Sequence, residues 1–390
     1  MISVDEALSH LFALVTPLEA DNVALIKAHG RVLARDVSAT RNQPPFAASA
    51  MDGYAVNARA IAPGQTFDVI GEAAAGHAWA GTVGASQAVR IFTGAPLPEG
   101  TDHVIIQENV TRTGDTITLD DSANDTAYVR PAGADFKMGD TIRAPRLLTP
   151  SDIALLASMN IATVPVTRRP IVAIIATGDE LVQPGEAPGP DQIIASNSYG
   201  LAALINQLGA TARLLPIARD NRASLALAFD LAADADLIVT IGGASVGDHD
   251  LVGDVAADKG MDRSFYKVAM RPGKPLMAGQ LGDATMIGLP GNPVSAMVCG
   301  HVFLAPVIRK MLGMGEQPAP RENHPLAKAV PANGPREHYM RAHLGPAGVT
   351  IFDRQDSALL TVLADANCLA VRPINDPARP SGDHIAIVRL

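Results

Sequence analysis

The stretch DLIVTIGGASVGDHD, residues 236–250, joins an apolar run to a loop rich in glycine and acid. The run DLIVTI is typical of a buried strand. In the loop, Gly242, Gly243 and Gly247 allow backbone N–H groups to face an anion, and Ser245 can donate a hydrogen bond. We therefore expect a strand followed by a phosphate-binding loop. This loop lacks the GK[ST] of a P-loop, and its glycines do not fit the GxGxxG pattern.

Two acidic residues, Asp248 and Asp250, end this loop. Their carboxylates cannot face an anion unless a divalent cation lies between, and oxygen ligands of this kind favour Mg²⁺. The alternative is that one of them, more readily Asp248, caps the helix predicted for LVGDVAAD at 251–258. The sequence leaves both interpretations open.

Strands and helices alternate on both sides of this stretch. Further strands are predicted for IVAIIA (171–176), ATARLLPIA (210–218), FYKVAM (265–270) and TMIGLP (285–290). Helices are predicted for NSYGLAALINQLG (197–209), RASLALAFDLAAD (222–234) and a long segment that begins at Pro293. Alternation of this kind predicts a mostly parallel sheet with helices on both faces.

Ligands of such sheets bind beyond the carboxyl ends of the strands. Three more unusual loops follow predicted strands, namely TGDEL (177–181), RPGKP (271–275) and GLPGNPVS (288–295). Arg271 and Lys274 supply the positive charge that phosphate or another oxyanion requires. Ser295 lies near the start of the long helix, where free N–H groups favour anions, although Asn292-Pro293 is also an ordinary helix start.

The first half of the chain has a different pattern. Apolar positions at helical spacing predict a helix within residues 5–20, which Pro17 ends, and a short helix at 151–161 with Ser151 as its N-cap. Between these helices, glycine-rich sequence with short β-rich runs predicts a β domain from about residue 46 to residue 140.

One acid stands alone in the segment PPFAASAMDGYAV (44–56). Asp52 precedes Gly53, and Asp-Gly is a turn signal. An isolated carboxylate among small residues is also suited to bind a metal ion or to act as a base, so both interpretations stay open.

The composition excludes several classes of protein. The chain has 390 residues, 47% of them hydrophobic, and a formal charge of -9, which argues against general nucleic-acid binding. The longest apolar run, 294–308, is shorter than the ~20 residues of a membrane span and predicts a core helix. The start has no secretory pattern, and two cysteines give no disulfide framework, so we expect a cytoplasmic protein.

Six motifs occur in a characteristic order, and together they resemble the MoeA family of molybdopterin molybdenumtransferases, which includes the E-domain of gephyrin. They are SAMDGYAV, TGAPLPEGTDHVIIQE, TGDEL, GGASVGDHD, RPGKP and GLPGNPVS. The resemblance covers nearly the whole chain. It implies insertion of molybdate into adenylylated molybdopterin with release of AMP, giving the molybdenum cofactor.

The resemblance also implies the architecture, a multidomain α/β fold. A parallel α/β molybdopterin-binding domain is accompanied by an inserted β domain, an elongated linking domain and a C-terminal β-barrel. The expected boundaries are 1–45 plus 141–168 for the linking domain, 46–140 for the inserted domain, 169–317 for the α/β domain and 318–390 for the barrel. The family works as a homodimer, with the active site between the α/β domain of one subunit and the first half of the other.

Functional positions follow from the matching motifs. The resemblance implies catalytic roles for Asp250, Asp52 and Lys274, and a metal site made by Asp250 and Asp52. The implied substrate-binding residues are Thr93, Arg130, Asp135, Glu180, Gly242, Gly243, Ser245, Asp248, Arg271, Ser295, Arg341 and Ser357. The implied cofactor is Mg²⁺. The implied substrates are adenylylated molybdopterin and molybdate, with the molybdopterin adenylyltransferase as a further candidate partner and neither nucleic acid nor a membrane involved.

Three positions depart from the family pattern. Ala134 stands where the family often has glutamate, Arg271 where lysine is frequent, and Asp356 where glycine is common. Asp356 places an acid beside Ser357, a proposed molybdate contact. Two other functions remain alternatives: an adenylyltransferase that makes the substrate, and a non-catalytic scaffold that binds partner peptides.

Overall fold

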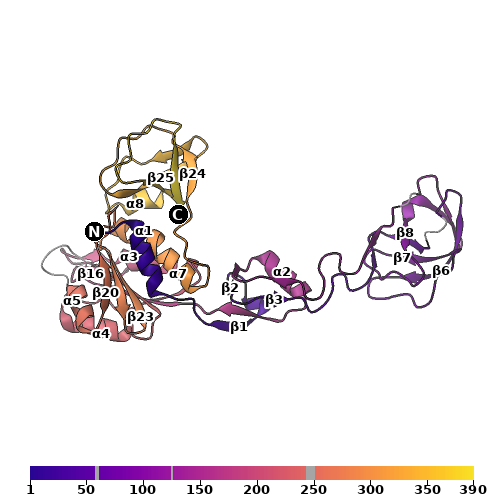
Figure 1. Cartoon of the computed structure of the whole chain (residues 1–390), viewed down its shortest axis with the longest axis horizontal. Helices are drawn as coiled ribbons and strands as arrows, with labels where there is room; N and C mark the ends of the chain where they lie inside the picture. Colours follow the sequence, from indigo (N-terminus) through magenta and orange to yellow (C-terminus); the bar gives the residue numbers. More distant parts are fainter. Residues whose placement is uncertain (58–60, 124–125, 243–250) are drawn as a thin grey trace. The chain divides into compact units, whose positions relative to one another are not determined.

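The computed structural model describes residues 1–57, 61–123, 126–242 and 251–390. The chain forms a multidomain α/β protein with several sheets, and it divides into two compact units (Figure 1). Unit 1 comprises Met1–Asp21, Gly30–Ala34 and Val166–Leu390, and unit 2 comprises Asn22–His29 and Arg35–Pro165. The four-domain boundaries expected from the sequence stay a prediction.

The main sheet of unit 1 has six strands in the order β18-β15-β19-β23-β22-β20. Their bounds are Thr211–Leu214 for β18, Ile171–Ala176 for β15, Leu237–Ile241 for β19, Ala284–Leu289 for β23, Met277–Leu281 for β22 and Asp262–Tyr266 for β20. The first four are mutually parallel, whereas β22 runs antiparallel to both of its neighbours. The sheet is therefore mixed.

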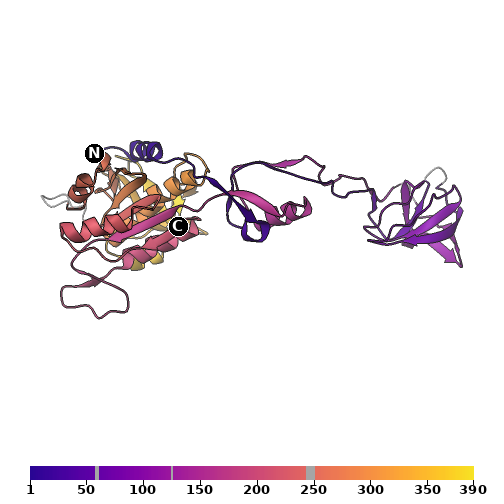
Figure 2. The same ribbon diagram turned by 90° about the horizontal axis from the view of Figure 1, so that it is seen from below.

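Helices cover both faces of this sheet because its strands are apolar on both sides (Figures 1 and 2). In β15, Val172 and Ile174 belong to one core cluster, and Ala173 and Ile175 belong to another. The first cluster includes residues of α1 (Val4–Leu14), α3 (Ser196–Gln207), α6 (Pro293–Cys299) and α7 (Ala305–Met311). The second includes residues of α4 (Arg222–Leu231) and α5 (Leu251–Asp258).

The long helix predicted from Pro293 runs to Met311 through a π-helical segment, η4 (Gly300–Leu304). Pro306 cannot donate to the preceding turn, and the wider π turn just before it, with Ala305 N–H donating to Gly300 O, accommodates this missing donor. Among the described residues, this is the one helical run long and apolar enough to cross a membrane, and 83% of that stretch is buried inside the molecule. The prediction of a core helix is confirmed.

One predicted strand is wrong. FYKVAM does not form a single strand, because β20 ends at Tyr266 and Lys267 has a φ of 71°. Met270 and Arg271 form a separate strand, β21, which joins another sheet. The following segment, Met277–Leu281, is the strand β22, which the sequence pattern did not reveal.

A second sheet of unit 1 contains the C-terminal strands, in the order β21-β25-β27-β28-β24, with β26 paired to β25. The bounds are Met270–Arg271 for β21, Glu337–Gly345 for β25, Cys368–Arg372 for β27, His384–Arg389 for β28, Glu322–Pro325 for β24 and Gly348–Ile351 for β26. Ala327, just after β24, donates its N–H to Val349 O of β26 at 2.9 Å. This hydrogen bond joins the segment after β24, the last strand of the order, to β26, which pairs with β25 outside the order. Helix α8 (Leu360–Ala364) lies between β26 and β27 in the chain.

Unit 2 contains a six-stranded sheet in the order β8-β5-β7-β6-β10-β9. The bounds are His103–Ile106 for β8, Gly53–Val56 for β5, Gln87–Ile91 for β7, Thr66–Ala73 for β6, Thr116–Leu119 for β10 and Val110–Thr113 for β9. Two short pairs accompany it: β4 (Ala48–Ser49) with β11 (Val129–Arg130), and β3 (Val37–Ser38) with β12 (Thr141–Ile142). The β-rich pattern of this region is confirmed.

The short helix predicted near residue 151 is α2 (Pro150–Ser158). Its N-cap is Thr149, whose side chain forms a capping box with Asp152, and not Ser151 as predicted. Pro150 explains the shift, because proline favours the first helical position and so leaves the cap to the residue before it. The remaining elements are β1 (Ala20–Ala24), β2 (Val32–Leu33), β13 (Arg146–Leu147) and β14 (Thr163–Thr167) in one sheet, the pair β16 (Leu181–Val182) and β17 (Ile193–Ile194), and the short helices Leu25–Lys27 and Gln107–Asn109.

Candidate functional site

The carboxyl ends of β15, β19 and β23 bring three of the predicted loops together. Thr177, the first residue of TGDEL, donates its N–H to Ile241 O at 3.0 Å, and Gly242 donates to Leu289 O at 3.1 Å. The loops that follow these neighbouring parallel strands therefore start side by side, as the sequence predicted.

Gly242 has no room for a side chain. Its φ is +93°, and a Cβ atom there would lie 2.9 Å from Thr177 O. Gly291 of the third loop also lies close by, since a Cβ on it would be in van der Waals contact with Gly242 Cα, at 3.5 Å. Only glycine at position 242 therefore lets the TGDEL loop and the glycine loop meet.

Glu180 lies exposed in the TGDEL loop. A Cβ atom on Gly178 would lie 2.4 Å from a carboxylate oxygen of Glu180, so this side chain folds back over the glycine. On the other side of the edge, Asn197 at the start of α3 donates its Nδ2 to Gly291 O at 2.7 Å. Glu180 and Asn197 therefore lie next to two of the three loops, Glu180 within the TGDEL loop and Asn197 against the third loop.

The RPGKP loop reaches the same edge, but by a route that the sequence did not reveal. Strand β22 is antiparallel to β23 and pairs Met277 with Gly288, so the loop before β22 lies at the carboxyl end of β23. The carbonyl of Lys274 accepts from Val268 N at 3.0 Å and from Leu276 N at 3.1 Å, and its side chain is exposed. Lys274 therefore lies on a tight turn beside the third loop, with its ammonium group exposed.

Ser295 and Ser357 belong to segments that meet at the start of α6. Ser295 is buried in the first turn, and the preceding Val294 donates its N–H to Ser357 O at 3.0 Å. One of the free N–H groups at this helix start is thus satisfied by the QDS segment. The two serines predicted from separate motifs belong to one local structure.

Arg341 on β25 is fully buried. Its Nη2 donates to Asp356 O at 2.9 Å, whereas Nε and Nη1 have no partner among the residues that the structure describes. Burial lowers the pKa of this guanidinium, the nearby Asp356 opposes the shift and Arg271 adds to it, and the group stays charged because arginine is so basic. A buried cation with two unpaired donors is suited to bind an oxyanion.

Asp356, one of the three departures, does not direct its carboxylate at Arg341. Its Oδ1 accepts from Ala358 N at 2.8 Å, so the carboxylate caps a local turn, while its backbone carbonyl holds the guanidinium. The acid at this position is therefore compatible with an anion site.

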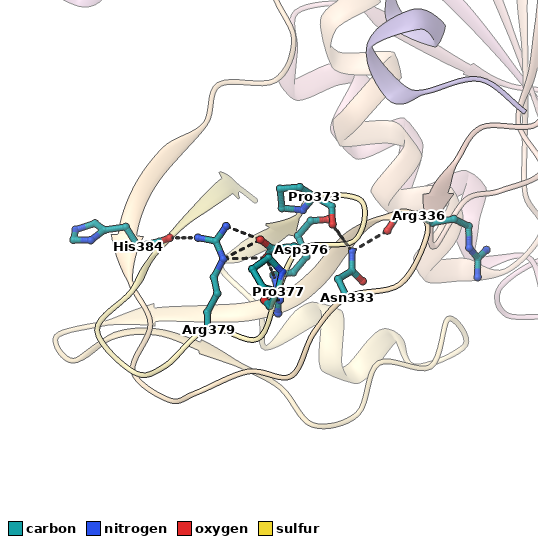
Figure 3. A network of polar contacts seen from close by, with 8 residues as sticks. Asn333, Arg336, Pro373, Asp376, Pro377, Arg379 and His384 are labelled. Carbon is teal, nitrogen blue, oxygen red and sulfur yellow. Dashed lines mark hydrogen bonds and ion pairs between the residues drawn. The ribbon is translucent and has the colours of Figure 1, made fainter.

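A buried ion-pair network supports the strand that carries Arg341 (Figure 3). Asp376 accepts hydrogen bonds from Arg372 and from Arg379, and Asn333 donates its Nδ2 to Arg336 O at 2.9 Å and to Pro373 O at 2.7 Å. Burial alone would raise the pKa of the Asp376 carboxyl, but the hydrogen bonds from the two arginines outweigh it and lower the pKa. The network fixes the segment that leads into β25.

In unit 2, Asp52 and Thr93 are in direct contact. Oδ1 of Asp52 accepts from Thr93 N at 2.7 Å and from Thr93 Oγ1 at 2.8 Å. These two hydrogen bonds, and then the charge of Arg90, lower the pKa of the Asp52 carboxyl, so it is ionised at neutral pH. Oδ2 has no hydrogen-bond partner in the described part of the chain. The carboxylate of Asp52 therefore has two roles open to it: Oδ1 holds the backbone of the loop at Thr93, and Oδ2 is available to a cation.

Backbone pairing brings Arg130 to the same loop of unit 2. Arg130 pairs with Ala48, and Ser49 exchanges backbone hydrogen bonds with Gly94 and Ala95. Asp135 lies exposed further along, with its N–H donating to Gln43 O at 2.9 Å.

Arg90 is a further residue at this loop that the sequence did not predict. Its guanidinium lies over the rings of Tyr54 and Phe92, 5.0 Å and 4.8 Å from their centroids, and donates to Gly53 O at 3.2 Å. Through this hydrogen bond to Gly53, Arg90 supports the backbone of the loop that carries Asp52. A lone arginine inside a strand pattern carries no signal that could have revealed this role.

Four predicted residues, Gly243, Ser245, Asp248 and Asp250, lie outside the described residues. Across 1–57, 61–123, 126–242 and 251–390, no three acidic, histidine or cysteine side chains gather as a metal cluster. Among these residues, Asp52 is the one predicted Mg²⁺ ligand, and its open carboxylate oxygen suits the ion. One carboxylate does not complete a Mg²⁺ site, so further ligands are needed.

A cavity of about 370 Å³ lies in unit 1 among residues of α3, the helical run from Pro293 and α8, and its member Asn197 contacts the third loop through Gly291 O. Its walls are mostly apolar and include Met297, Leu360 and Leu363, with Asn197 and His301 as polar members. Burial, and then the charge of Arg309, lower the pKa of His301 to about 4, so this imidazole is neutral at pH 7. The cavity can hold a flat, largely apolar group beside the third loop.

Three family models match the chain in order. Residues 2–160 match the MoeA N-terminal region (domain I and II), residues 173–310 match a probable molybdopterin binding domain, and residues 323–390 match the MoeA C-terminal region (domain IV). The α/β domain with its loop cluster thus falls in the class of molybdopterin-binding domains.

Curated proteins named molybdopterin molybdenumtransferase are similar over the whole chain. The protein of Haemophilus influenzae is 36% identical over 95% of this chain and 94% of its own, and that of Nostoc sp. is 35% identical over 100% and 94%. A solved structure, titled as a molybdopterin biosynthesis MoeA protein from Pyrococcus horikosii, has a TM-score of 0.86 and 28% identity, covering 100% of this chain and 99% of the other. The chain belongs to the MoeA family.

Proposed function

We propose that this chain inserts molybdate into adenylylated molybdopterin and releases AMP. The coarser activity is that of its family: it is a molybdopterin molybdenumtransferase, an enzyme that inserts molybdenum into molybdopterin during synthesis of the molybdenum cofactor. The observation that carries the finer proposal is Arg341, a fully buried guanidinium near Arg271 of the RPGKP loop, with two donors that have no partner in the described part of the chain.

The molybdate is bound, in this proposal, by Arg341 and Arg271, with Lys274 and the serines at positions 295 and 357 as further contacts. The planar donors of both arginines suit an oxyanion, and the burial of Arg341 strengthens the interaction of its guanidinium with the anion. The substrate supplies the dithiolene sulfurs, so no protein cysteine is required. This agrees with the burial of Cys299, which raises the pKa of its thiol far above the usual value.

The metal site is proposed at Asp250 together with Asp52 of the partner subunit, in a homodimer. Mg²⁺ bound there would offset the negative charge that develops on the leaving AMP. Asp52 is the proposed metal ligand that the structure describes. Thr93 donates two hydrogen bonds to one of its carboxylate oxygens and lowers the pKa of the carboxyl, so the carboxylate is charged and its other oxygen is available to the metal. Arg130, whose strand pairs beside this loop, and Asp135, which lies further along unit 2, are proposed as substrate contacts.

The pterin ring is proposed to occupy the cavity next to Asn197. The ring is flat, and the cavity combines apolar walls with the amide of Asn197, which also contacts the third loop. The glycine loop, with Gly242, Gly243 and Ser245, is proposed to bind the phosphates between pterin and adenosine. Asp248 of this loop and Glu180 of the neighbouring loop are proposed as further substrate-binding residues, which face the phosphates only across a cation.

The finer architecture also remains proposed: a linking domain, an inserted β domain, an α/β domain and a C-terminal β-barrel. The hydrogen bond from Ala327 to Val349, which links the segment after β24 to β26 and so brings the last strand of the order back towards β25, supports the barrel. A cytoplasmic location and an interaction with the adenylyltransferase are proposals of the same kind.

Two other functions are less well supported. An adenylyltransferase would not need the regions that match the MoeA N-terminal and C-terminal models, and consumption of ATP would reveal it. A scaffold would not need the unpaired donors of Arg341, and capture of a partner by a catalytically inactive variant would reveal that role.

The proposal is tested by anaerobic incubation of the protein with adenylylated molybdopterin, molybdate and Mg²⁺, followed by measurement of AMP and of reconstituted cofactor. We expect stoichiometric AMP that depends on molybdate. Asp250→Ala should abolish it, and Asp254→Asn, a change of an exposed acid on α5, should not. Wild-type rates in Asp250→Ala would contradict the proposed metal site.

A further inference from the structure

The RPGKP loop has a buried residue between its two exposed cations. Arg271 and Lys274 are exposed, whereas Gly273 is buried. Pairing with β25 holds the loop at Arg271, and the tight turn at Lys274 holds its other end. The position of the middle of the loop therefore depends on what Gly273 packs against.

Gly273 packs against two buried sulfur atoms. Its φ is +110°, and a Cβ atom there would lie 2.6 Å from Cys299 Sγ and 3.1 Å from Met270 Sδ. Both of these residues are 0% exposed and belong to the same core cluster. Met270 belongs to β21, which leads into the loop, whereas Cys299 contributes its contact from a different element, α6. The loop backbone therefore contacts α6 directly, with no room between them for even a methyl group.

The same helix also contacts the other half of the proposed oxyanion site. At the start of α6, Val294 donates its N–H to Ser357 O at 3.0 Å. The carbonyl of Asp356, next to Ser357, accepts from Arg341 Nη2 at 2.9 Å. Helix α6 therefore connects the segment that holds Arg341 with the Cys299 sulfur that the RPGKP loop contacts.

The two arginines of the proposed site repel each other. Arg271 lies near enough to Arg341 that its charge lowers the pKa of the Arg341 guanidinium, in addition to the larger effect of burial. Without a bound anion, this repulsion favours movement of the exposed loop away from the buried arginine. A fixed contact in the middle of the loop limits this movement and preorganises the cations for an anion.

We propose that Cys299 is a positioning residue of the oxyanion site, whose sulfur fixes the RPGKP loop, and so the cations of that loop, relative to Arg341. The inference rests on the proposed oxyanion site. Cys299 acts through Gly273 by van der Waals contact, and its thiol forms no bond to the substrate. The site therefore uses the volume of this buried side chain and not its reactivity.

The test removes the sulfur and compares the binding of the two substrates. In Cys299→Ala the loop loses its contact with α6, so the Kd for molybdate, measured by calorimetry on the full chain, should rise severalfold. KM for adenylylated molybdopterin, measured by AMP release at saturating molybdate, should stay near that of the wild type. The residues that line the cavity are unchanged in this variant.

Cys368→Ala is the matched control, because Cys368 is also 0% exposed. Cys368 belongs to the core cluster on the other face of the C-terminal sheet from Leu369, the residue that pairs with Arg341. This variant loses the same atom and should lower the free energy of unfolding to a similar extent. Its molybdate affinity should equal that of the wild type.

A second set of variants tests the contact itself. Gly273→Ala places a methyl group against the sulfur, and this overpacking should weaken molybdate binding by about tenfold or more. Combining Gly273→Ala with Cys299→Ala makes room for the methyl group and should recover part of the lost affinity. Combining it with Cys368→Ala should recover none. The strain of alanine at a φ of +110° is common to both double variants, so their difference reports the contact.

A molybdate affinity in Cys299→Ala equal to that in Cys368→Ala would overturn the inference, while the proposed oxyanion site would stand. Equal losses in the two double variants would also overturn it, as would an equal rise in KM for adenylylated molybdopterin, which indicates a general loosening of the fold. If Gly273→Ala does not fold, the comparison of the two cysteine variants decides. Failure of the wild type to bind molybdate would instead contradict the oxyanion site, and the inference with it.

Discussion

Asp52 accepts two hydrogen bonds from Thr93 on one carboxylate oxygen, at 2.7 Å from the backbone N–H and at 2.8 Å from the hydroxyl. Thr93→Val removes the hydroxyl donor and keeps the backbone donor, so the pKa of Asp52 should rise toward its usual value. The acid limb of the pH–rate profile for AMP release should move to higher pH, and the rate at neutral pH should fall by ~10-fold or less.

Thr93→Ser keeps the hydroxyl and is the matched control for this change. It should leave both the limb and the rate near those of the wild type. If Thr93→Val and Thr93→Ser have the same pH–rate profile, the hydroxyl of Thr93 does not set the ionisation of Asp52.

Arg341 should dominate the affinity for molybdate, because it is buried and two of its donors have no partner among the residues that the structure describes. Arg341→Gln should weaken molybdate binding about tenfold or more, as expected for loss of about 1.5–3 kcal/mol from charge-assisted hydrogen bonds. Arg354→Gln changes an exposed arginine of the neighbouring segment and should have little effect. Calorimetry measures both, and equal affinities in the two variants would rule out a direct role for Arg341.

Gly242 should tolerate no side chain, since a Cβ atom would meet Thr177 O at 2.9 Å. Gly260→Ala isolates the cost of a positive φ, because Gly260 has a φ of +89° and no atom within 4 Å of its Cβ position. We expect Gly260→Ala to lower the free energy of unfolding by about 1 kcal/mol. Gly242→Ala should lower it by roughly 1–3 kcal/mol more and should disrupt substrate binding. Urea unfolding compares the two, and equal losses would mean that the loops move apart freely.

Asp376 should contribute strongly to stability, because it neutralises Arg372, which is also buried, and Arg379. Asp376→Asn should cost roughly 3–5 kcal/mol of unfolding free energy, the range for breaking a buried ion pair. Asp383→Asn removes an exposed acid of the same segment and should change little. If Asp376→Asn lowers the free energy of unfolding by less than about 1 kcal/mol, the ion-pair network is not needed for stability.

The same carboxyl predicts how stability depends on pH. Its pKa is lower in the folded than in the unfolded protein, so its stabilisation is complete above the unfolded value of about 3.9. It is lost as the pH falls through the lower, folded value. The wild type should therefore lose stability below about pH 4, and the Asp376→Asn variant should lack this part of the loss.

Filling the cavity beside Asn197 should weaken the binding of adenylylated molybdopterin and leave the binding of molybdate unchanged. Leu363→Trp would fill part of the cavity and should raise KM for adenylylated molybdopterin severalfold, without changing the affinity for molybdate. Leu227→Trp, on the exposed side of α4, is the control for the added ring. Unchanged KM in Leu363→Trp would place the pterin elsewhere.

Much of the α/β core could be predicted from the sequence because its signals are local. IVAIIA is the strand β15 with the predicted bounds, and the predicted helix that closes on Gly209 ends where this glycine adopts a φ of +91°. Parallel strands place their loops at one edge, so the meeting of Thr177, Gly242 and Gly291 followed from the order of elements alone.

What could not be predicted depends on pairing between distant segments. The interruption of FYKVAM at Lys267 and the pairing of Arg271 with His338 require strands from two parts of the chain, and no local pattern reveals them. The roles of Arg90 and Cys299 were missed for the same reason, because each residue acquires its role from neighbours far away in the sequence. The family resemblance supplied Arg341 as a site residue, but not the unpaired donors that make it suited to an anion.

Strand β21 has a consequence for dissecting this protein into fragments. Its two residues leave the α/β domain and pair with β25 of the C-terminal region, with Glu337 N donating to Ala269 O at 3.0 Å. A fragment ending before residue 318 would lose the template for this strand, and one starting there would expose an open edge to other chains. Arg271 and Lys274, which are proposed to bind the oxyanion, would then lie on a segment without its partner strand, so excised pieces are poor substitutes for the intact enzyme.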